Sequence, residues 1–106
     1  MKTIGIIGYD LFGTGGTTRS NTNLINEFLA DNKEIIYFNL LPFSNSKMRK
    51  VKEALVNPTR IRFLQLKDFW ESDKADTYII TRESLFIFAK IIKQRYPEAK
   101  VIGEVH

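Results

Sequence analysis

The stretch TIGIIG at residues 3–8 decides the interpretation of this chain, together with the glycine-rich segment GTGGTT that follows at residues 13–18. A short apolar run with β-branched residues is typical of a strand buried on both faces, as at the centre of a parallel sheet. Three glycines in four positions and no periodicity predict a loop after it. Apolar residues at helical spacing then predict a helix over residues 18–30.

Predicted strands and helices continue to alternate along the rest of the chain. Apolar strands are predicted at residues 34–38 (EIIYF), 77–81 (TYIIT) and 100–105 (KVIGEV). Ser46 is the expected cap of a second helix, and Pro97 is expected to end a helix with apolar residues from Leu85 to Tyr96. Residues 60–66 are expected as an edge strand and residues 67–73 as a short helical turn. The pattern predicts a Rossmann-like, three-layer α/β domain over residues 1–106, with a mostly parallel sheet of about four to five strands.

Length and composition set further bounds. A chain of 106 residues with 43% hydrophobic side chains and eight phenylalanines is one domain with a packed core. The absence of cysteine excludes disulfides, thiolate metal sites and cysteine nucleophiles. Because the single histidine is His106, a Ser-His-Asp triad or a site with several histidine ligands is a poor fit. We therefore expect no metal site and no tightly bound cofactor.

The charge pattern is modestly basic, with a net charge of +4. The densest basic stretch holds Lys47, Arg49, Lys50, Lys52, Arg60, Arg62 and Lys67. These side chains could rest on anionic lipid or could simply form a solvated surface, and both interpretations stay open. Nucleic acid is not an expected partner, because aromatic and basic residues do not interleave. With no secretory leader pattern, the expected location is the cytoplasm, with peripheral contact at the inner face of the membrane.

The glycine-rich loop is the main candidate for a binding site. In parallel α/β sheets, ligands bind beyond the carboxyl ends of the strands, where the strand order reverses. Glycines let backbone N–H groups approach a ligand, and a helix N-terminus adds unpaired donors and partial positive charge. Thr17, Thr18 and Ser20 offer hydroxyls and Arg19 a planar set of donors. A phosphate cradle is favoured, with a plain tight connection as the alternative.

Two known phosphate-binding motifs do not fit the loop. Gly8 and Gly13 have the glycine spacing of a Walker A loop, but Thr14 and Gly15 stand where that motif needs Lys and Ser or Thr. Thr18 occupies the position of the third glycine in the dinucleotide fingerprint. Neither an NTPase loop nor a dinucleotide site is therefore predicted.

The chain resembles the start of a GT-B glycosyltransferase, a class with two Rossmann domains that moves a sugar from a nucleotide-sugar donor. The matching stretches are residues 2–8, 15–21 (GGTTRSN), 26–29 (NEFL), 75–80 (ADTYII) and 100–106 (KVIGEVH). The resemblance is to bacterial enzymes that build cell-surface polymers such as teichoic acids or capsules. It implies that the nucleotide-sugar is a substrate, and that the acceptor is a polymer or a lipid-linked molecule.

The resemblance also assigns roles to residues. It implies that Gly15, Gly16, Thr17, Thr18 and Arg19 contact the donor diphosphate. On the acceptor side the candidates are Asp10, Glu104 and His106, with His106 as the candidate catalytic base or a hydroxyl anchor. The alternatives stay open: Asp10 could instead form a turn, Glu104 could face solvent, and His106 could be the ordinary end of an ordered segment.

The nucleotide pocket and the paired glutamates of the family's C-terminal domain have no counterpart in this sequence. The resemblance thus implies an incomplete N-terminal half that needs that domain as a partner, and weak or absent catalysis by the 106-residue chain alone. Two alternatives remain. One is a stand-alone α/β module that binds a phosphate-bearing ligand or a protein without catalysis, and the other is a teichoic acid polyol-phosphate transferase domain.

Overall fold

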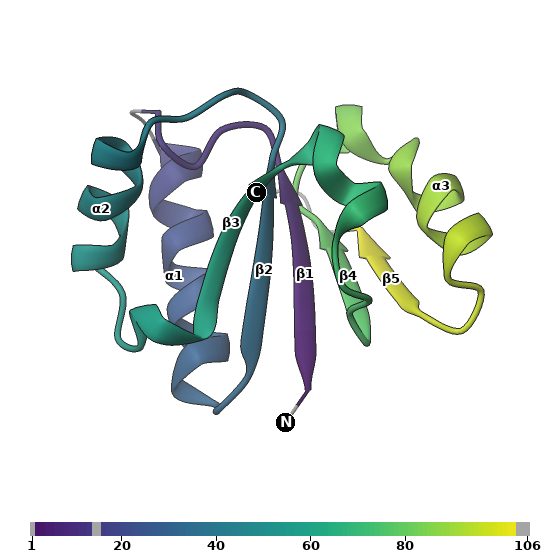
Figure 1. The fold of residues 1–106 in the computed structure, drawn as a ribbon, viewed down its shortest axis with the longest axis horizontal. Coiled ribbons are helices and arrows are strands. Elements are labelled where there is room, and N and C mark those ends of the chain that lie inside the picture. The colour runs from purple at the N-terminus through teal and green to yellow at the C-terminus, as the bar shows by residue number, and fades with distance from the viewer. Residues whose placement is uncertain (1, 14–15, 104–106) are drawn as a thin grey trace.

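The fold is a five-stranded parallel sheet covered by helices on both faces (Figure 1). The computed structural model describes residues 2–13 and 16–103. Its strands are β1 (Thr3–Gly8), β2 (Glu34–Asn39), β3 (Ile61–Gln65), β4 (Thr77–Ile80) and β5 (Lys100–Gly103). Its α-helices are α1 (Gly16–Ala30), α2 (Asn45–Glu53) and α3 (Phe88–Arg95), and short 3₁₀ helices are η1 (Pro58–Arg60), η2 (Leu66–Glu71) and η3 (Glu83–Leu85).

The strand order is β3-β2-β1-β4-β5, and every neighbouring pair is parallel. β1 lies at the centre, hydrogen-bonded to β2 on one side and to β4 on the other. This position explains its sequence, because a central parallel strand is buried on both faces and needs apolar or small residues throughout. The predicted Rossmann-like α/β fold is confirmed.

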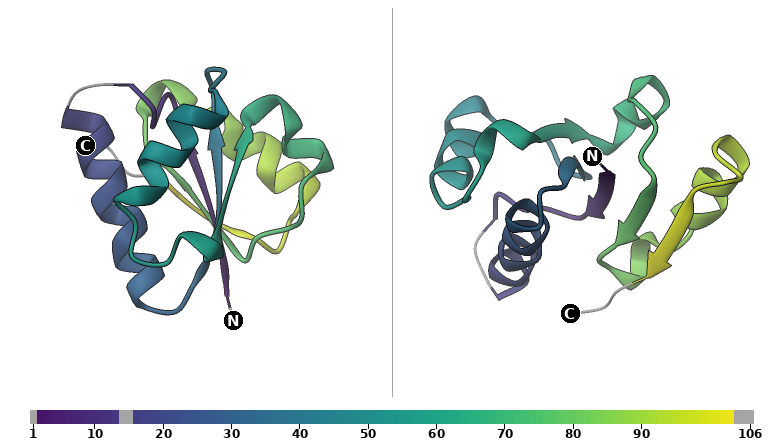
Figure 2. Two further views of the ribbon diagram at one scale, coloured as in Figure 1. Left: turned by 60° about the vertical axis from the view of Figure 1, so that its left-hand side comes forward. Right: turned by 90° about the horizontal axis from the view of Figure 1, so that it is seen from below.

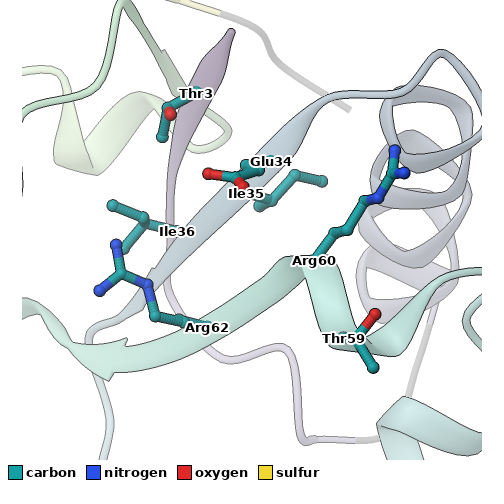
Figure 3. Close-up of a pocket in the computed structure, with 7 residues that line it drawn as sticks. All are labelled: Thr3, Glu34, Ile35, Ile36, Thr59, Arg60 and Arg62. Atoms are coloured by element: carbon teal, nitrogen blue, oxygen red, sulfur yellow. The ribbon is translucent and has the colours of Figure 1, made fainter. Parts of the chain in front are cut away.

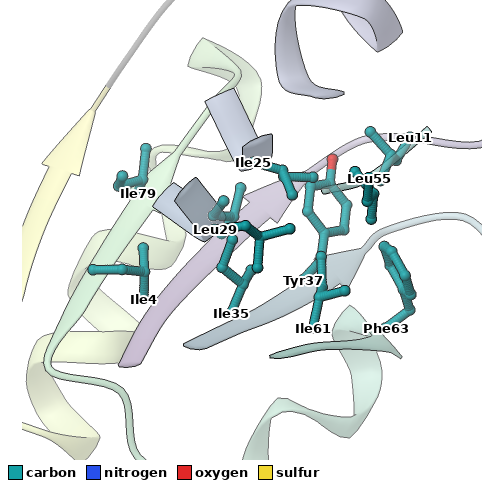
Figure 4. Close-up of a cluster of buried hydrophobic side chains, with 11 residues drawn as sticks. Ile4, Leu11, Ile25, Leu29, Ile35, Tyr37, Leu55, Ile61, Phe63 and Ile79 are labelled. Atoms are coloured by element: carbon teal, nitrogen blue, oxygen red, sulfur yellow. The ribbon is translucent and has the colours of Figure 1, made fainter. Parts of the chain in front are cut away.

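Successive β1 residues point into two separate cores. Ile4 and Ile6 join the α1-face cluster, in which Ile25 and Leu29 of α1 pack on the sheet, and Figure 4 shows the Tyr37 ring among its aliphatic side chains. Ile7 joins the α3-face cluster, built on η2 and α3. Figure 2 shows α1 and α2 on one side of the sheet and α3 on the other.

Glycines on β1 make room for tyrosines on each face. A Cβ at Gly5 would lie 2.5 Å from Cδ1 of Tyr78, which is fully buried on β4. On the opposite face, a Cβ at Gly8 would lie 2.0 Å from the hydroxyl oxygen of Tyr37, which is fully buried on β2. Both glycines are needed for space, since a methyl group in either place would overlap a buried ring.

Several boundaries differ from the sequence expectations. Ser44, not Ser46, caps α2, and its Oγ accepts a hydrogen bond from the Lys47 N–H at 3.3 Å. The expected helix from Leu85 to Tyr96 is divided into η3 and α3. Leu85 and Phe88 are three residues apart, and a 3₁₀ turn satisfies that spacing as well as an α-helix does. The edge strand and the helical turn after it are confirmed as β3 and η2.

Among the residues that the structure describes, no helix is long and apolar enough to cross a membrane.

The Gly5–Tyr78 contact gives a first prediction. Gly5→Ala should lower the free energy of unfolding by about 1–3 kcal/mol, because the new methyl group displaces a fully buried ring. Urea unfolding followed by circular dichroism measures the change. Lys100→Ala, at an exposed strand position, is the control and should change stability by less than about 0.5 kcal/mol. Equal stability of the wild-type and Gly5→Ala proteins would contradict the space argument.

Candidate functional site

The candidate site lies at the carboxyl ends of β1, β2 and β4. β1 is followed by the connection to α1, which leads towards β2, whereas the chain reaches β4 on the opposite side of β1 after β3. The order of strands therefore reverses between β1 and β4, and in such sheets this is where ligands bind. The segments after β1, β2 and β4 meet at this edge.

Asn39, at the end of β2, ties these segments together. Its side chain is fully buried, and its Oδ1 accepts a hydrogen bond from the Leu11 N–H at 2.7 Å. Its Nδ2 donates to the Leu41 carbonyl at 2.7 Å and to Asp10 Oδ1 at 3.2 Å. One buried amide thus holds the loop after β1 against the loop after β2.

Asp10 also holds the loop. Its Oδ1 accepts a second hydrogen bond, from the Phe12 N–H at 3.1 Å. Its Oδ2 lies 3.0 Å from the place that a Cβ on Gly13 would take. Asp10 therefore forms the turn, and its predicted contact with an acceptor stays a prediction. Gly13 does not adopt a left-handed backbone, and a Cβ there would be in tight contact with the Asp10 carboxylate.

The structure describes some of the other predicted site residues and leaves others outside the described part of the chain. Gly16 begins α1, and Arg19 is exposed in its first turn, where there is no acidic residue. Gly15, Glu104 and His106 lie outside the described residues, as do the side chains of Thr17 and Thr18. Within residues 2–13 and 16–103, no cluster of three or more His, Cys, Asp or Glu could hold a metal ion.

Arg82 is a site residue that the sequence analysis missed. It lies two residues after the end of β4, and its guanidinium carbon lies 4.4 Å from the centroid of the Tyr9 ring, which follows β1. A cation over an aromatic ring is held electrostatically, so this pair fixes a positive charge beside the point where the strand order reverses. Its place immediately after the predicted strand at residues 77–81 was the available signal.

A buried polar pair lies beneath the first half of α1. Asn21 is 2% exposed, and its Nδ2 lies 3.5 Å from the hydroxyl oxygen of Tyr37. Asn21 Oδ1 is buried and has no hydrogen-bond partner in the described part of the chain. Burial raises the pKa of Tyr37 well above its usual value, against a lowering by the Asn21 hydrogen bond and with a further rise from the Asp10 charge. Tyr37 looked like an ordinary core aromatic in the sequence, so nothing there indicated this pair.

The basic stretch does not form one surface. The Arg60 guanidinium donates to the side-chain oxygen of Asn32, in the turn after α1. Arg62 pairs with Asp73 at 3.1 Å, and Lys67 lines a cavity on the α3 face. The four cations of the α2 segment belong to the opposite layer, since α2 packs on the α1-face cluster. The expected membrane contact therefore has fewer cations on one face than the sequence suggested.

A cavity of about 250 Å³ at the amino ends of β1, β2 and β3 is a weaker candidate. Its walls include Arg60 and Arg62, and Figure 3 shows these two side chains pointing away from each other. Because their guanidinium groups diverge, they do not converge on one anion.

Comparison of the chain with protein-family models, curated proteins and solved structures found no match.

The Asn39 network gives a second prediction. Asn39→Ala should lower the free energy of unfolding by about 2–4 kcal/mol, because the Leu11 N–H and the Leu41 carbonyl lose their partner. Asn57→Ala is the matched control: it removes one longer, partly exposed bond, from Nδ2 to the Leu29 carbonyl at 3.3 Å. We expect about 1 kcal/mol or less there. Chemical unfolding measures both variants, and equal losses would show that the network does not hold the loops.

The buried phenol gives a third prediction. Because the pKa of Tyr37 is higher in the folded than in the unfolded chain, the folded state keeps its proton when the unfolded state loses it. The free energy of unfolding should therefore fall as the pH rises through about 10. Burial also raises the pKa of Tyr78, so a smaller dependence remains in Tyr37→Phe. Urea unfolding between about pH 9 and pH 11 tests this, and parallel curves for the wild type and Tyr37→Phe would refute it.

Proposed function

We propose that this chain is the N-terminal, acceptor-side domain of a GT-B glycosyltransferase, which moves a sugar from a nucleotide-sugar donor to a cell-envelope polymer or glycolipid. The observation that carries the proposal is where α1 begins. It starts at Gly16, within the stretch that resembles the family and beyond the carboxyl end of the central strand β1. In this fold that position is suited to a phosphate group.

The electrostatics of this edge support a diphosphate ligand. The first N–H groups of α1 have no partner within the helix, and the helix dipole adds about half a positive charge at this end. No acidic side chain in the first turn offsets it, and Arg19 adds a full charge. Arg82, held over Tyr9, supplies a second cation from the other side of β1.

These groups have a clear role in sugar transfer. As the bond between the sugar and the nucleotide breaks, negative charge grows on the departing diphosphate. Donors fixed in advance stabilise that charge without reorganising, which lowers the barrier. The loop that carries Gly13 is fixed by Asn39 and Asp10, so it needs little further ordering when the ligand binds. In the proposed arrangement a second α/β domain supplies the nucleotide pocket.

The experiment is an NMR titration of the 106-residue chain at low salt, first with inorganic pyrophosphate and then with UDP-glucose. Both should shift the amides of Gly13, Gly16 and Arg19 with similar Kd values, of the order of 1 mM, because only the diphosphate faces this domain. Inorganic phosphate should bind several-fold more weakly. Arg82→Gln should weaken pyrophosphate binding about threefold to tenfold.

Arg95→Gln, which changes an exposed arginine at the end of α3, is the matched control and should leave pyrophosphate binding unchanged. If no saturable shift occurs at the start of α1, the diphosphate site is refuted. If inorganic phosphate binds as tightly as UDP-glucose, the result favours a phosphate-binding module without catalysis. Sugar transfer by the 106-residue chain itself would contradict the need for a second domain.

A further inference from the structure

A second cavity opens at the carboxyl edge of the sheet, on the α3 face and apart from the start of α1. Its volume is about 420 Å³, within the range of about 300–1,000 Å³ that small-molecule sites occupy. Most of its wall is apolar, from Leu40 after β2, Leu66 and Trp70 of η2, and Phe88 at the start of α3. The function proposed above uses none of these residues.

The Trp70 side chain is exposed to solvent and is also held in place by its neighbours. The chain has one tryptophan, and 52% of its surface is accessible. Its position is nevertheless fixed. The ring packs edge-on against Phe69 with centroids 5.6 Å apart, Arg95 Cζ lies 5.6 Å from its centroid, and Arg95 Nη2 donates to the Trp70 carbonyl at 3.0 Å. A large aromatic surface held in place and left open is a preorganised surface for stacking.

Two polar side chains complete the wall of the cavity and limit the chemical class of ligand that it can bind. Gln65, at the end of β3, is partly buried, and Lys67 is exposed. Within residues 2–13 and 16–103, no carboxylate pairs with Lys67. A sugar ring would need partners for hydroxyls around its whole rim, and this lining offers two polar side chains among mostly apolar ones. A flat apolar ring with one negative group matches it better.

We propose that this cavity binds a planar, mostly apolar ring compound that carries a single anionic group. The ring lies among Leu40, Trp70 and Phe88, and the anion pairs with Lys67. Gln65 offers a hydrogen bond that fixes the orientation of the ring. The site is independent of the diphosphate site, because the two share no lining residue.

The test uses the 106-residue chain and 2-naphthalenesulfonate, a flat ring with one negative charge. Because there is one tryptophan, the indole N–H gives a single NMR signal that reports on the cavity. We expect a saturable shift of that signal with a Kd of the order of 0.1–1 mM. The neutral ring 2-naphthalenemethanol and the ringless anion methanesulfonate should each bind at least about fivefold more weakly.

Three variants separate the charge of Lys67 from general effects. Lys67→Gln should weaken binding of 2-naphthalenesulfonate about fivefold to tenfold, whereas Lys67→Arg should keep most of the affinity. Lys100→Gln, an exposed lysine on β5, should change nothing. Each variant is first checked for a wild-type pattern of amide signals, so that misfolding is recognised.

The proposal is refuted if the indole signal does not saturate up to about 10 mM probe, or if Lys67→Gln and Lys100→Gln bind equally. Tighter binding of glucose 1-phosphate than of 2-naphthalenesulfonate would also refute it, in favour of a sugar ligand. None of these three results would affect the pyrophosphate titration at the start of α1, so the two proposals fail separately.

Discussion

The fold depends on two places where β1 has no side chain. Gly5 admits the Tyr78 ring on one face, and Gly8 admits the Tyr37 hydroxyl on the other. Each tyrosine comes from a neighbouring strand, β4 or β2, so the central strand is covered by rings from both of its partners. These rings fill the space that a larger residue at position 5 or 8 would occupy. A side chain at either position would therefore displace a buried ring and disturb the packing of β1 against its neighbouring strands.

The parts of the fold that were predictable have a strong apolar period. The strand at residues 34–38 and the helix ending at Ala30 could be recognised because burial on one or both faces leaves a regular pattern. The η3–α3 region could not be resolved, since apolar spacing of three residues fits both helix types. The cap at Ser44 was missed because Ser46 is chemically equivalent, and only the bond to the Lys47 N–H decides between them.

The sheet edge that holds the candidate site could be predicted from the sequence, but the side-chain contacts that form it could not. The rule that ligands bind where strand order reverses pointed to the glycine-rich loop from sequence alone. The residues that build this edge could not be predicted in the same way. Asn39 is the last residue of β2 and Arg82 lies just beyond β4, and they act through contacts across about 30 and 70 residues of sequence. Contacts so distant along the chain leave no local periodicity, so only the topology brings them into view.

The contacts of the Asn39 amide also predict which residues related proteins should share. Its oxygen and nitrogen bind groups from two loops at once, and Asp10 Oδ1 accepts one of the hydrogen bonds that its Nδ2 donates. An exchange at position 39 leaves the Leu11 N–H and the Leu41 carbonyl without their side-chain partner, and a change at position 10 can compensate only for the bond between Asn39 and Asp10. Descendants of the same ancestor should therefore keep Asn39, and this amide would identify distant kin even after the glycines of the neighbouring loop have diverged.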